Sequence, residues 1–162
     1  DPVSGLFNRR YFHSRLQEEL ERSRRHQTPL TLMMIDLDDF KRVNDSLGHL
    51  AGDAILCRTA EILRRSVRLF DVCTRFGGDE FAIIMPGMPK TSATLVAERI
   101  RDAVETSPPG TGHAGDPRST VSIGLATIVG GTTPRGLVAQ ADQALYSAKR
   151  DGKNCIRVLE EG

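Results

Sequence analysis

The sequence predicts an α/β fold in which helices pack on a mixed, mostly antiparallel central sheet. Segments with apolar residues at three- and four-residue spacing, typical of helices, alternate with short apolar runs typical of buried strands. Two strand-like runs, residues 72–76 and 80–85, are separated by only three residues, so they form a hairpin and the sheet cannot be entirely parallel. The length of 162 residues suits one domain, and we expect residues 1–162 to form it.

The first half of the chain contains segments that spacing and stop signals identify as helices or strands. Charged residues with apolar ones at helical spacing predict a helix over 8–26, which ends before a proline. The apolar run 30–35 is too short for a helix and is followed by aspartates, so we interpret it as a buried strand. A short helix over 40–47 ends at Gly48, and a longer helix is expected over 54–67.

In the second half the apolar period changes from helical spacing to alternation and back. The hairpin strands come first, and a stretch rich in Pro and Gly over 107–118 is expected to be a surface loop. The remaining expected elements are helices over 91–104 and 134–150 and strands over 120–128 and 155–159. The expected order of elements along the chain is therefore α-β-α-α-β-β-α-β-α-β.

Composition and charge restrict the partners. The chain has 22 Lys and Arg against 21 Asp and Glu, a net charge of +1, so no overall basic field favours nucleic acid or a membrane surface. There is no apolar run of about 18 residues and no signal-peptide pattern, so we expect a cytoplasmic domain that does not insert into a membrane. Because the chain does not begin with Met, we expect a fragment of a longer protein, which could itself be membrane-anchored.

The cysteines and histidines indicate neither a disulfide framework nor a zinc site. Cys57, Cys73 and Cys155 are odd in number and lack C-x-x-C spacing, so we expect reduced residues in the core. The histidines show no metal-ligand spacing and are expected at the surface or at helix caps: His13, His26, His49 and His113.

Acidic residues cluster at two points that a sheet could bring together. Asp36, Asp38 and Asp39 follow the first buried strand, and Asp79 and Glu80 lie at the hairpin tip. In extended backbone Asp36 and Asp38 share one face and Asp39 takes the other. This group could also be a polar strand end, with Asp39 capping the next helix. If both groups lie at one edge of the sheet, carboxylate repulsion favours a bound Mg²⁺, which prefers oxygen ligands.

Two features near these acids suit a nucleotide. The turn into the helix that begins at Phe40 offers backbone amides to a phosphate. Gly77 and Gly78 would supply the positive φ of a tight hairpin turn, and a turn without side chains also lets a ligand approach closely. Residues 130–133 lack the lysine of a P-loop, and no other segment matches that motif. Carboxylates, metal and helix amides together favour phosphoryl or nucleotidyl transfer.

An amide and a carboxylate could recognise a base. Asn44 and Asp53 can together pair with the O6, N1–H and N2–H₂ groups of guanine. On one continuous helix they would point to opposite sides, but we expect Gly48 and Gly52 to interrupt the helix, so that both side chains face one pocket. In the alternative interpretation, Asn44 lies on a helix surface and Asp53 is an N-cap.

Two lysines near the end of the last long helix could hold phosphates. Lys149 and Lys153 are four residues apart and so lie on one face of a helix. The alternative is that they only interact favourably with the helix dipole.

Together these motifs resemble the GGDEF domain of diguanylate cyclases from one end of the chain to the other. Several ordered motifs at consistent spacing make the resemblance specific. They are the opening segment 1–10 (DPVSGLFNRR), residues 36–45 (DLDDFKRVND), Gly48-His49, Gly52-Asp53, residues 75–81 (RFGGDEF) and residues 146–154 (YSAKRDGKN).

The resemblance implies a palm-like nucleotidyl cyclase fold and the condensation of two GTP molecules into cyclic di-GMP and two pyrophosphates, at a site between two facing domains of a homodimer. Asp36, the Leu37 carbonyl and Asp79 would hold Mg²⁺ or Mn²⁺, with Glu80 completing the acidic site, and Asp79 would accept the proton of the attacking 3′-hydroxyl. Asp53, being an acid, resembles GTP-selective members. The implied substrate-binding residues are Phe40, Lys41, Asn44, His49, Asp53, Gly77, Gly78, Lys149 and Lys153.

The resemblance also implies product inhibition. Arg68 and Asp71 form an R-x-x-D motif just before the signature hairpin, and Arg99 lies on the next helix. The alternative for Arg68 and Asp71 is a surface salt bridge. Two other functions remain open: a non-catalytic module that binds cyclic di-GMP or GTP, and a dimerising scaffold. The intact acids favour the enzyme.

Overall fold

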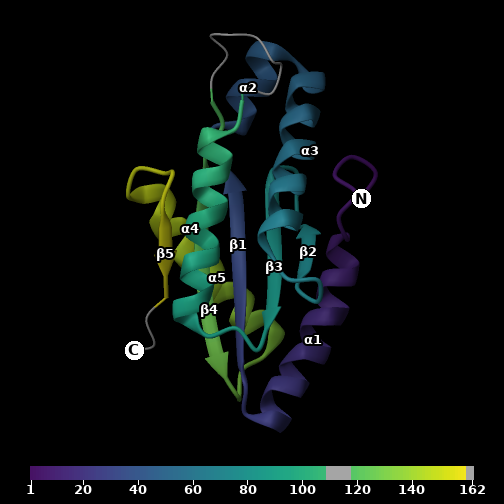
Figure 1. Ribbon diagram of the computed structural model, residues 1–162, viewed down its shortest axis with the longest axis vertical. Coiled ribbons are helices and arrows are strands. Elements are labelled where there is room, and N and C mark those ends of the chain that lie inside the picture. The colour runs from purple at the N-terminus through teal and green to yellow at the C-terminus, as the bar shows by residue number, and fades with distance from the viewer. Residues whose placement is uncertain (109–117, 160–162) are drawn as a thin grey trace.

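The computed structural model describes residues 1–108 and 118–159. Five strands form one sheet in the order β2-β3-β1-β4-β5. The central strand β1 (Pro29–Leu37) pairs antiparallel with both β3 (Glu80–Pro86) and β4 (Val121–Val129). At the edges, β2 (Val72–Arg75) pairs antiparallel with β3, and β5 (Ile156–Val158) pairs parallel with β4. The predicted mixed, mostly antiparallel sheet is confirmed (Figure 1).

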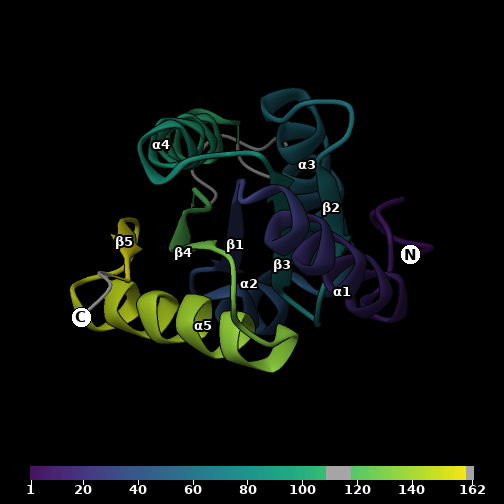
Figure 2. The ribbon, with the colours of Figure 1, turned by 90° about the horizontal axis from the view of Figure 1, so that it is seen from below.

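Helices cover both faces of the sheet. α1 (Arg9–His26) and α5 (Pro134–Arg150) lie on one face, and α3 (His49–Ser66) and α4 (Lys90–Thr106) lie on the other (Figure 2). The short α2 (Phe40–Leu47) follows β1 directly and packs against α3. The order along the chain is as predicted, and most bounds differ from the prediction by one or two residues, because helix and strand ends are weakly specified locally.

The alternating side chains of β1 supply both layers of the core. Leu32 and Met34 pack with apolar residues of α1 and α5, whereas Met33 and Ile35 pack with those of α3 and α4. Asp36 continues the first alternation at the carboxyl end of the strand, so its side chain lies on the α1–α5 face. The buried strand β1 thus carries a charged residue one position before its carboxyl end.

The start of α3 differs from the prediction. The helix begins at His49, and only Gly48, with φ 87 and ψ 169, interrupts the path from α2. Gly52 lies inside α3, so the expectation that it also breaks the helix was wrong. A Cβ at Gly52 would lie 1.9 Å from Asn44 Oδ1. The close packing of α2 on α3 therefore overrides the low helix propensity of glycine.

The cysteines and histidines are placed mostly as expected. Cys73 is buried and Cys155 half-buried, but Cys57 is exposed on α3, so the prediction that it fills the core was wrong. Its Sγ lies 3.0 Å from the Val3 carbonyl oxygen. No helix within residues 1–108 and 118–159 is long and apolar enough to cross a membrane. His13, His26 and His49 are exposed, whereas His113 and most of the loop predicted over 107–118 lie outside the described residues.

Candidate active site

Acidic residues from two strands meet at the carboxyl end of β1. Asp36 and Glu80 are direct partners in the β1–β3 register, so their side chains lie on one face of the sheet. Asp79 precedes Glu80, and its carbonyl oxygen accepts a hydrogen bond of 3.0 Å from the backbone N–H of Leu37. The fold therefore brings the two acidic groups identified in the sequence to one edge of the sheet.

Burial raises the pKa of two of these carboxyl groups. Asp36 is 6% exposed. Burial raises its pKa to about 6, with repulsion from Asp79 and Glu80 acting in the same direction and the ion pair with Lys149 acting against it. Burial also raises the pKa of Glu80, as do the nearby charges of Asp142 and Asp79. A cation placed among these groups would favour their ionised forms.

Two lysines from the end of the chain reach the same edge. Lys149 Nζ lies 2.6 Å from Asp36 Oδ2, and Lys153 Nζ lies 2.8 Å from Asp39 Oδ1. The expectation that both lysines share one face of a helix was wrong, because α5 ends at Arg150 and Lys153 lies in the following turn with φ 64. The turn, and not helical spacing, brings Lys153 to the end of β1.

The neighbouring aspartates have different surroundings. The Asp38 carboxylate accepts hydrogen bonds from Thr120 Oγ1 at 2.8 Å, Ser122 Oγ at 2.6 Å and the backbone N–H of Asn154 at 3.0 Å. Asp38 thus ties the end of β1 to β4 and to the turn after α5. Asp39 stands at the N-cap of α2 with φ 55, and its side chain makes no capping bond, so the capping interpretation was wrong.

The residues at this edge fit a divalent cation. Across the part of the chain that the structure describes, no three acidic, histidine or cysteine side chains form a ready-made metal cage. Mg²⁺ needs none, because it commonly takes one or two carboxylates together with substrate phosphates and water. The ammonium group of Lys149, 2.6 Å from Asp36 Oδ2, already places a positive charge against the buried carboxylate. The hard oxygen atoms of Asp36, Leu37 and Asp79 suit Mg²⁺ or Mn²⁺.

Polar side chains lie where α2 packs on α3. Asn44 Oδ1 is buried, and no hydrogen-bond donor among the described residues reaches it. The Asn44 side chain lies against Gly52, where a Cβ would also meet Phe40 Cζ at 3.1 Å. Asp53 follows Gly52 and is exposed in the second turn of α3, so it is not the N-cap that one interpretation proposed. A buried, unpaired acceptor beside an exposed carboxylate suits a ligand with several N–H donors.

Other residues near the contact between α2 and α3 are solvent-accessible. Lys41 and His49 are exposed, and Phe40 is half-buried at the start of α2. Lys41 and Phe40 form the first turn of α2, which directly follows the aspartates at the end of β1. A phosphate at that turn would lie next to the acidic cluster.

The glycines of the hairpin provide space. Neither Gly77 nor Gly78 has a φ in the left-handed region, so the prediction that they supply positive φ was wrong. A Cβ at Gly77 would lie 3.0 Å from Glu80 Oε2, whereas Gly78 has open space where its Cβ would be. Gly77 therefore leaves room for the Glu80 carboxylate, and Gly78 leaves its side of the turn open.

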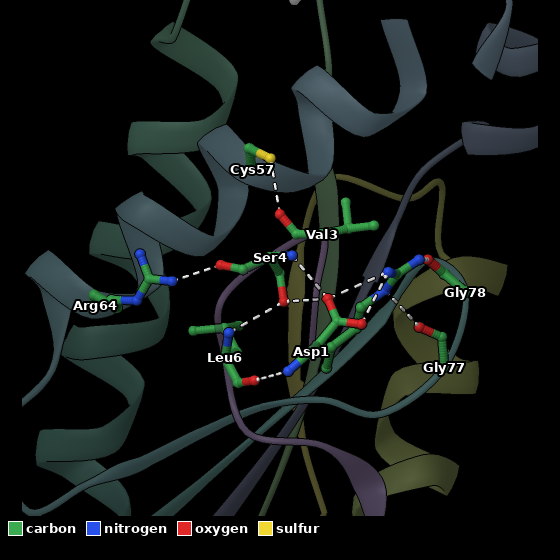
Figure 3. A network of polar contacts seen from close by, with 9 residues as sticks. Asp1, Val3, Ser4, Leu6, Cys57, Arg64, Gly77 and Gly78 are labelled. Atoms are coloured by element: carbon green, nitrogen blue, oxygen red, sulfur yellow. Dashed lines mark hydrogen bonds and ion pairs between the residues drawn. The ribbon is translucent and has the colours of Figure 1, made fainter. Parts of the chain in front are cut away.

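The N-terminal segment holds this hairpin in place (Figure 3). Arg75 donates to the carbonyl oxygens of Gly77 at 3.2 Å and Gly78 at 2.8 Å, and its Nη1 lies 3.3 Å from Asp1 Oδ2. The Asp1 carboxylate also accepts hydrogen bonds of 2.7 Å from the backbone N–H and the hydroxyl of Ser4. The carbonyls before Asp79 are therefore held by Arg75, which is itself held by its ion pair with Asp1.

The R-x-x-D motif forms a closed ion pair at the other end of β2. Arg68 donates from Nη2 to Asp71 Oδ1 at 2.7 Å and from Nε to Oδ2 at 3.1 Å, and it also reaches the Pro86 carbonyl oxygen at 2.8 Å. The salt bridge of the alternative interpretation therefore forms, but only its Arg68 side is at the surface: that side chain is 37% exposed, whereas the Asp71 side chain is fully buried. Arg99 of α4 donates to the Ser66 carbonyl oxygen and so lies close to the motif.

Two grooves border Arg68. One, of about 520 Å³, is lined by Leu6, Val67 and Leu69 among others, and a second, of about 390 Å³, includes Phe70. The Arg68 guanidinium lies 4.4 Å from the centre of the Phe70 ring. An arginine beside exposed apolar groups suits a planar, charged ligand.

Sequence reasoning missed three residues of this region. Asp1 and Arg75 lie within motifs that carried the family resemblance, but neither was assigned a role, because only the fold brings residues 74 positions apart into contact. Asp142 of α5 adds negative charge near Glu80. A carboxylate exposed on a helix has no local signal that distinguishes it from an ordinary surface residue.

The arrangement of the sheet, with acids at the end of its central strand and lysines opposite them, defines the class of the protein as a palm-like nucleotidyl cyclase domain. The chain belongs to the GGDEF domain family of diguanylate cyclases: the model of that family, described as "Diguanylate cyclase, GGDEF domain", matches residues 1–155. The resemblance seen in the sequence is thereby confirmed.

Individual relatives agree. The chain is 39% identical over 158 residues to the response regulator PleD of Caulobacter vibrioides, covering 96% of this chain and 35% of PleD. It is 39% identical to the diguanylate cyclase DgcP of Pseudomonas aeruginosa, covering 98% and 23%. The chain therefore spans about a third or less of these two relatives.

Solved structures show the same fold. The GGDEF domain of DgcB from Caulobacter crescentus, in complex with c-di-GMP, matches with a TM-score of 0.93 and 30% identity, covering 99% of this chain and 93% of that one. The active GGEEF domain of a diguanylate cyclase from Vibrio cholerae matches with a TM-score of 0.90 and 30% identity, covering 97% and 99%.

Proposed function

We propose that this chain condenses two GTP molecules into cyclic di-GMP with release of two pyrophosphates. The observation that carries the proposal is the pairing of Asp36 with Glu80 across β1 and β3, with Lys149 Nζ 2.6 Å from Asp36 Oδ2. This edge combines acids that can bind a metal with a cation that can bind a phosphate. Family membership supports the same reaction.

The metal ligands in this proposal are the carboxylates of Asp36 and Asp79 and the carbonyl of Leu37, with Glu80 beside them. Mg²⁺ or Mn²⁺ supplies charge neutralisation and Lewis acidity to the triphosphate when bound. The hydrogen bond from the backbone N–H of Leu37 to the carbonyl oxygen of Asp79 supports this assignment, since it fixes the position of Asp79 relative to the end of β1. The raised pKa of Asp36 supports it too, because a cation offsets the cost of burying that charge.

The chain's own groups carry the proton and the phosphates. The carboxylate of Asp79 accepts the proton of the attacking 3′-hydroxyl of one GTP, while the oxygen of that hydroxyl forms a bond to the α-phosphorus of the second GTP. The bond between that phosphorus and the oxygen that bridges the α- and β-phosphates breaks, and pyrophosphate leaves with the electron pair of that bond. Lys149 and Lys153 exchange their aspartate partners for phosphate oxygens, and the first turn of α2, at Phe40 and Lys41, offers amides to the same phosphates.

Guanine binds where α2 packs on α3 in this proposal. Asn44 Oδ1, which is buried and unpaired among the described residues, accepts from a guanine N–H. Asp53 accepts from another, and the exposed His49 begins the same helix, four residues before Asp53. Adenine lacks the N1–H donor, so these two acceptors select GTP. The open turn at Gly77 and Gly78 leaves space for the nucleotide.

The reaction needs two copies of the chain, because each holds one GTP and the 3′-hydroxyl of one substrate must meet the α-phosphate of the other. A homodimer with the two sites facing each other satisfies this requirement by a two-fold axis.

Cyclic di-GMP inhibits the enzyme in this proposal by binding Arg68 and Arg99, while Asp71 orients Arg68. The two-point contact of Arg68 with a fully buried Asp71 supports this, because it fixes a partly exposed guanidinium in a rigid geometry. Two domains linked through such sites would hold their GTP sites apart.

The decisive experiment is incubation of the concentrated protein with GTP and Mg²⁺, followed by chromatographic separation of the nucleotides. Cyclic di-GMP and pyrophosphate are the expected products. Binding of cyclic di-GMP without turnover would instead identify a receptor module, and dimerisation without binding or turnover would identify a scaffold. Asp79→Asn serves as the matched inactive control.

A further inference from the structure

The turn between α5 and β5 has an unusual backbone. Lys153 and Asn154 are consecutive residues with φ 64 and φ 46. A residue with a Cβ seldom adopts this left-handed conformation, and two in succession persist only where surrounding contacts stabilise them. The contacts of this turn therefore indicate what it is built to hold.

Three hydrogen bonds fix the turn from three directions. The Lys153 N–H donates to the Ala148 carbonyl at 3.1 Å and closes the end of α5. The Asn154 N–H donates to Asp38 Oδ2 at 3.0 Å, which joins the turn to the end of β1. Arg101 Nη1 of α4 donates to Asn154 Oδ1 at 3.1 Å across 53 positions of sequence.

Arg101 is itself held rigidly. Its Nε lies 3.1 Å from Glu98 Oε2 and its Nη1 lies 2.6 Å from Glu105 Oε2, both on the same helix. Its side chain is 21% exposed, whereas those of Glu98 and Glu105 are 54% and 42% exposed. The two glutamates orient the guanidinium, and its bond to Asn154 joins α4 to the turn.

The turn presents one functional group to the candidate active site. Lys153 Nζ lies 2.8 Å from Asp39 Oδ1, at the entrance to α2. The neighbouring Asp38 accepts hydrogen bonds from Thr120, which precedes β4, and from Ser122 of β4. The turn is therefore fixed on the β1 side through Asp38 and on the α4 side through Arg101, and Lys153 extends between the two.

We propose that Arg101 is a positioning residue for GTP: through Asn154 it holds the left-handed turn that places the Lys153 ammonium beside the triphosphate. This rests on the proposed phosphate role of Lys153 and adds a residue of α4, which lies on the face of the sheet opposite α5. Because Arg101 acts only through Lys153, its loss cannot weaken phosphate binding by more than the loss of Lys153 itself.

Calorimetric titration of the 162-residue chain can test this with two probes, an α,β-methylene analogue of GTP, which cannot be condensed, and GMP, which lacks the β- and γ-phosphates. The variants are Arg101→Gln, Asn154→Gly, Lys153→Ala and the double variant Arg101→Gln/Lys153→Ala. Asn154→Gly keeps the left-handed backbone and the N–H to Asp38 but removes the acceptor of Arg101. Glu18→Gln is the control, since it breaks an exposed Arg15–Glu18 ion pair of α1 and leaves Arg101 and Asn154 with all their partners.

We expect Lys153→Ala to weaken binding of the GTP analogue by about two- to fivefold, the range for a partly exposed ion pair. Arg101→Gln and Asn154→Gly should weaken it by a similar or smaller factor, and the double variant should bind no more weakly than Lys153→Ala. GMP binding should be unchanged in all of them, and the control Glu18→Gln should bind both probes normally.

Three results would overturn the proposal. If Lys153→Ala weakens analogue binding but Arg101→Gln and Asn154→Gly do not, Arg101 has no positioning role and the proposed function is unaffected. If Arg101→Gln weakens GMP and the analogue equally, its role is general stability. If Lys153→Ala changes nothing, the phosphate role of Lys153 fails and the positioning role fails with it. Should Arg101→Gln not fold, Asn154→Gly makes the same distinctions.

Discussion

Replacing Asp36 by asparagine should stabilise the fold at neutral pH while it removes activity. In the metal-free protein the Asp36 pKa is raised from 3.8 to about 6. The folded state then holds a proton that the unfolded state has lost, so Asp36 reduces the free energy of unfolding as pH rises from about 4 to about 6. Above that range the cost is constant.

The magnitude follows from the size of the shift. At 1.36 kcal/mol per pKa unit, a change of about two units corresponds to about 3 kcal/mol in total. The free energy of unfolding of the wild type falls by roughly 2 kcal/mol of this total between about pH 4.5 and about pH 7.5. The Asp36→Asn variant has no such loss. Its free energy of unfolding, measured relative to that of the wild type, should therefore be about 2 kcal/mol higher at the upper pH than at the lower one. For a chain of this size this corresponds to about 4–8 °C in melting temperature.

Thermal unfolding in a chelating buffer at both pH values measures this difference. Other titrating groups are shared by both proteins and cancel when the variant is compared with the wild type at each pH. Adding Mg²⁺ with the GTP analogue near pH 7.5 should then stabilise the wild type more than Asp36→Asn. A stability difference between the two proteins that does not change with pH would show that burial of the Asp36 carboxylate carries no cost, and the argument for a cation at this site would lose its electrostatic basis.

Three further outcomes are expected. Asp79→Ala should lower cyclic di-GMP synthesis by roughly a hundredfold or more with an unchanged melting temperature, since a half-exposed hairpin residue serves the reaction and not the core; appreciable turnover in a GTP assay would remove Asp79 from the mechanism. Gly52→Ala should weaken GTP binding by roughly tenfold and reduce the preference over ATP, because its Cβ would lie 1.9 Å from Asn44 Oδ1; competition titrations that show unaltered selectivity would place base recognition elsewhere. Arg68→Ala should abolish the slowing of full progress curves by accumulated product without lowering the initial rate. It should also lower the melting temperature, because the fully buried Asp71 loses its partner. A progress curve that still slows at the same product concentration would show that Arg68 has only a structural role.

The expectations that held depend on local signals. The run 30–35 of β1 is apolar apart from Thr31 and is bounded by a proline and aspartates. α5 begins at a proline and ends two residues before a glycine, so the identities of both elements can be read from neighbouring residues. The short hairpin connection required antiparallel strands, and the structure has them. Motif order along the chain was sufficient to indicate the family before any contact was known.

The expectations that failed depended on packing. Gly52 was expected to break a helix, but α2 packs so closely on α3 that a residue without a side chain is needed there, and the helix continues. Asp38 and Asp39 are adjacent in sequence, yet one is bound by three donors of the fold and the other pairs with a lysine 114 positions away. Nothing in the local sequence separates these two environments.

By itself, the sequence determined the order of helices and strands, the mixed sheet and the family, because helical period, alternation, turn residues and motif spacing are properties of short segments. Only the tertiary structure decided that Asp36 and Glu80 face each other, that Asn44 Oδ1 is buried without a partner among the described residues, and that Arg101 reaches the turn of Lys153. These are contacts between distant segments. Their energies depend on burial and on distances of a few ångströms, which a linear pattern does not encode until the chain has packed.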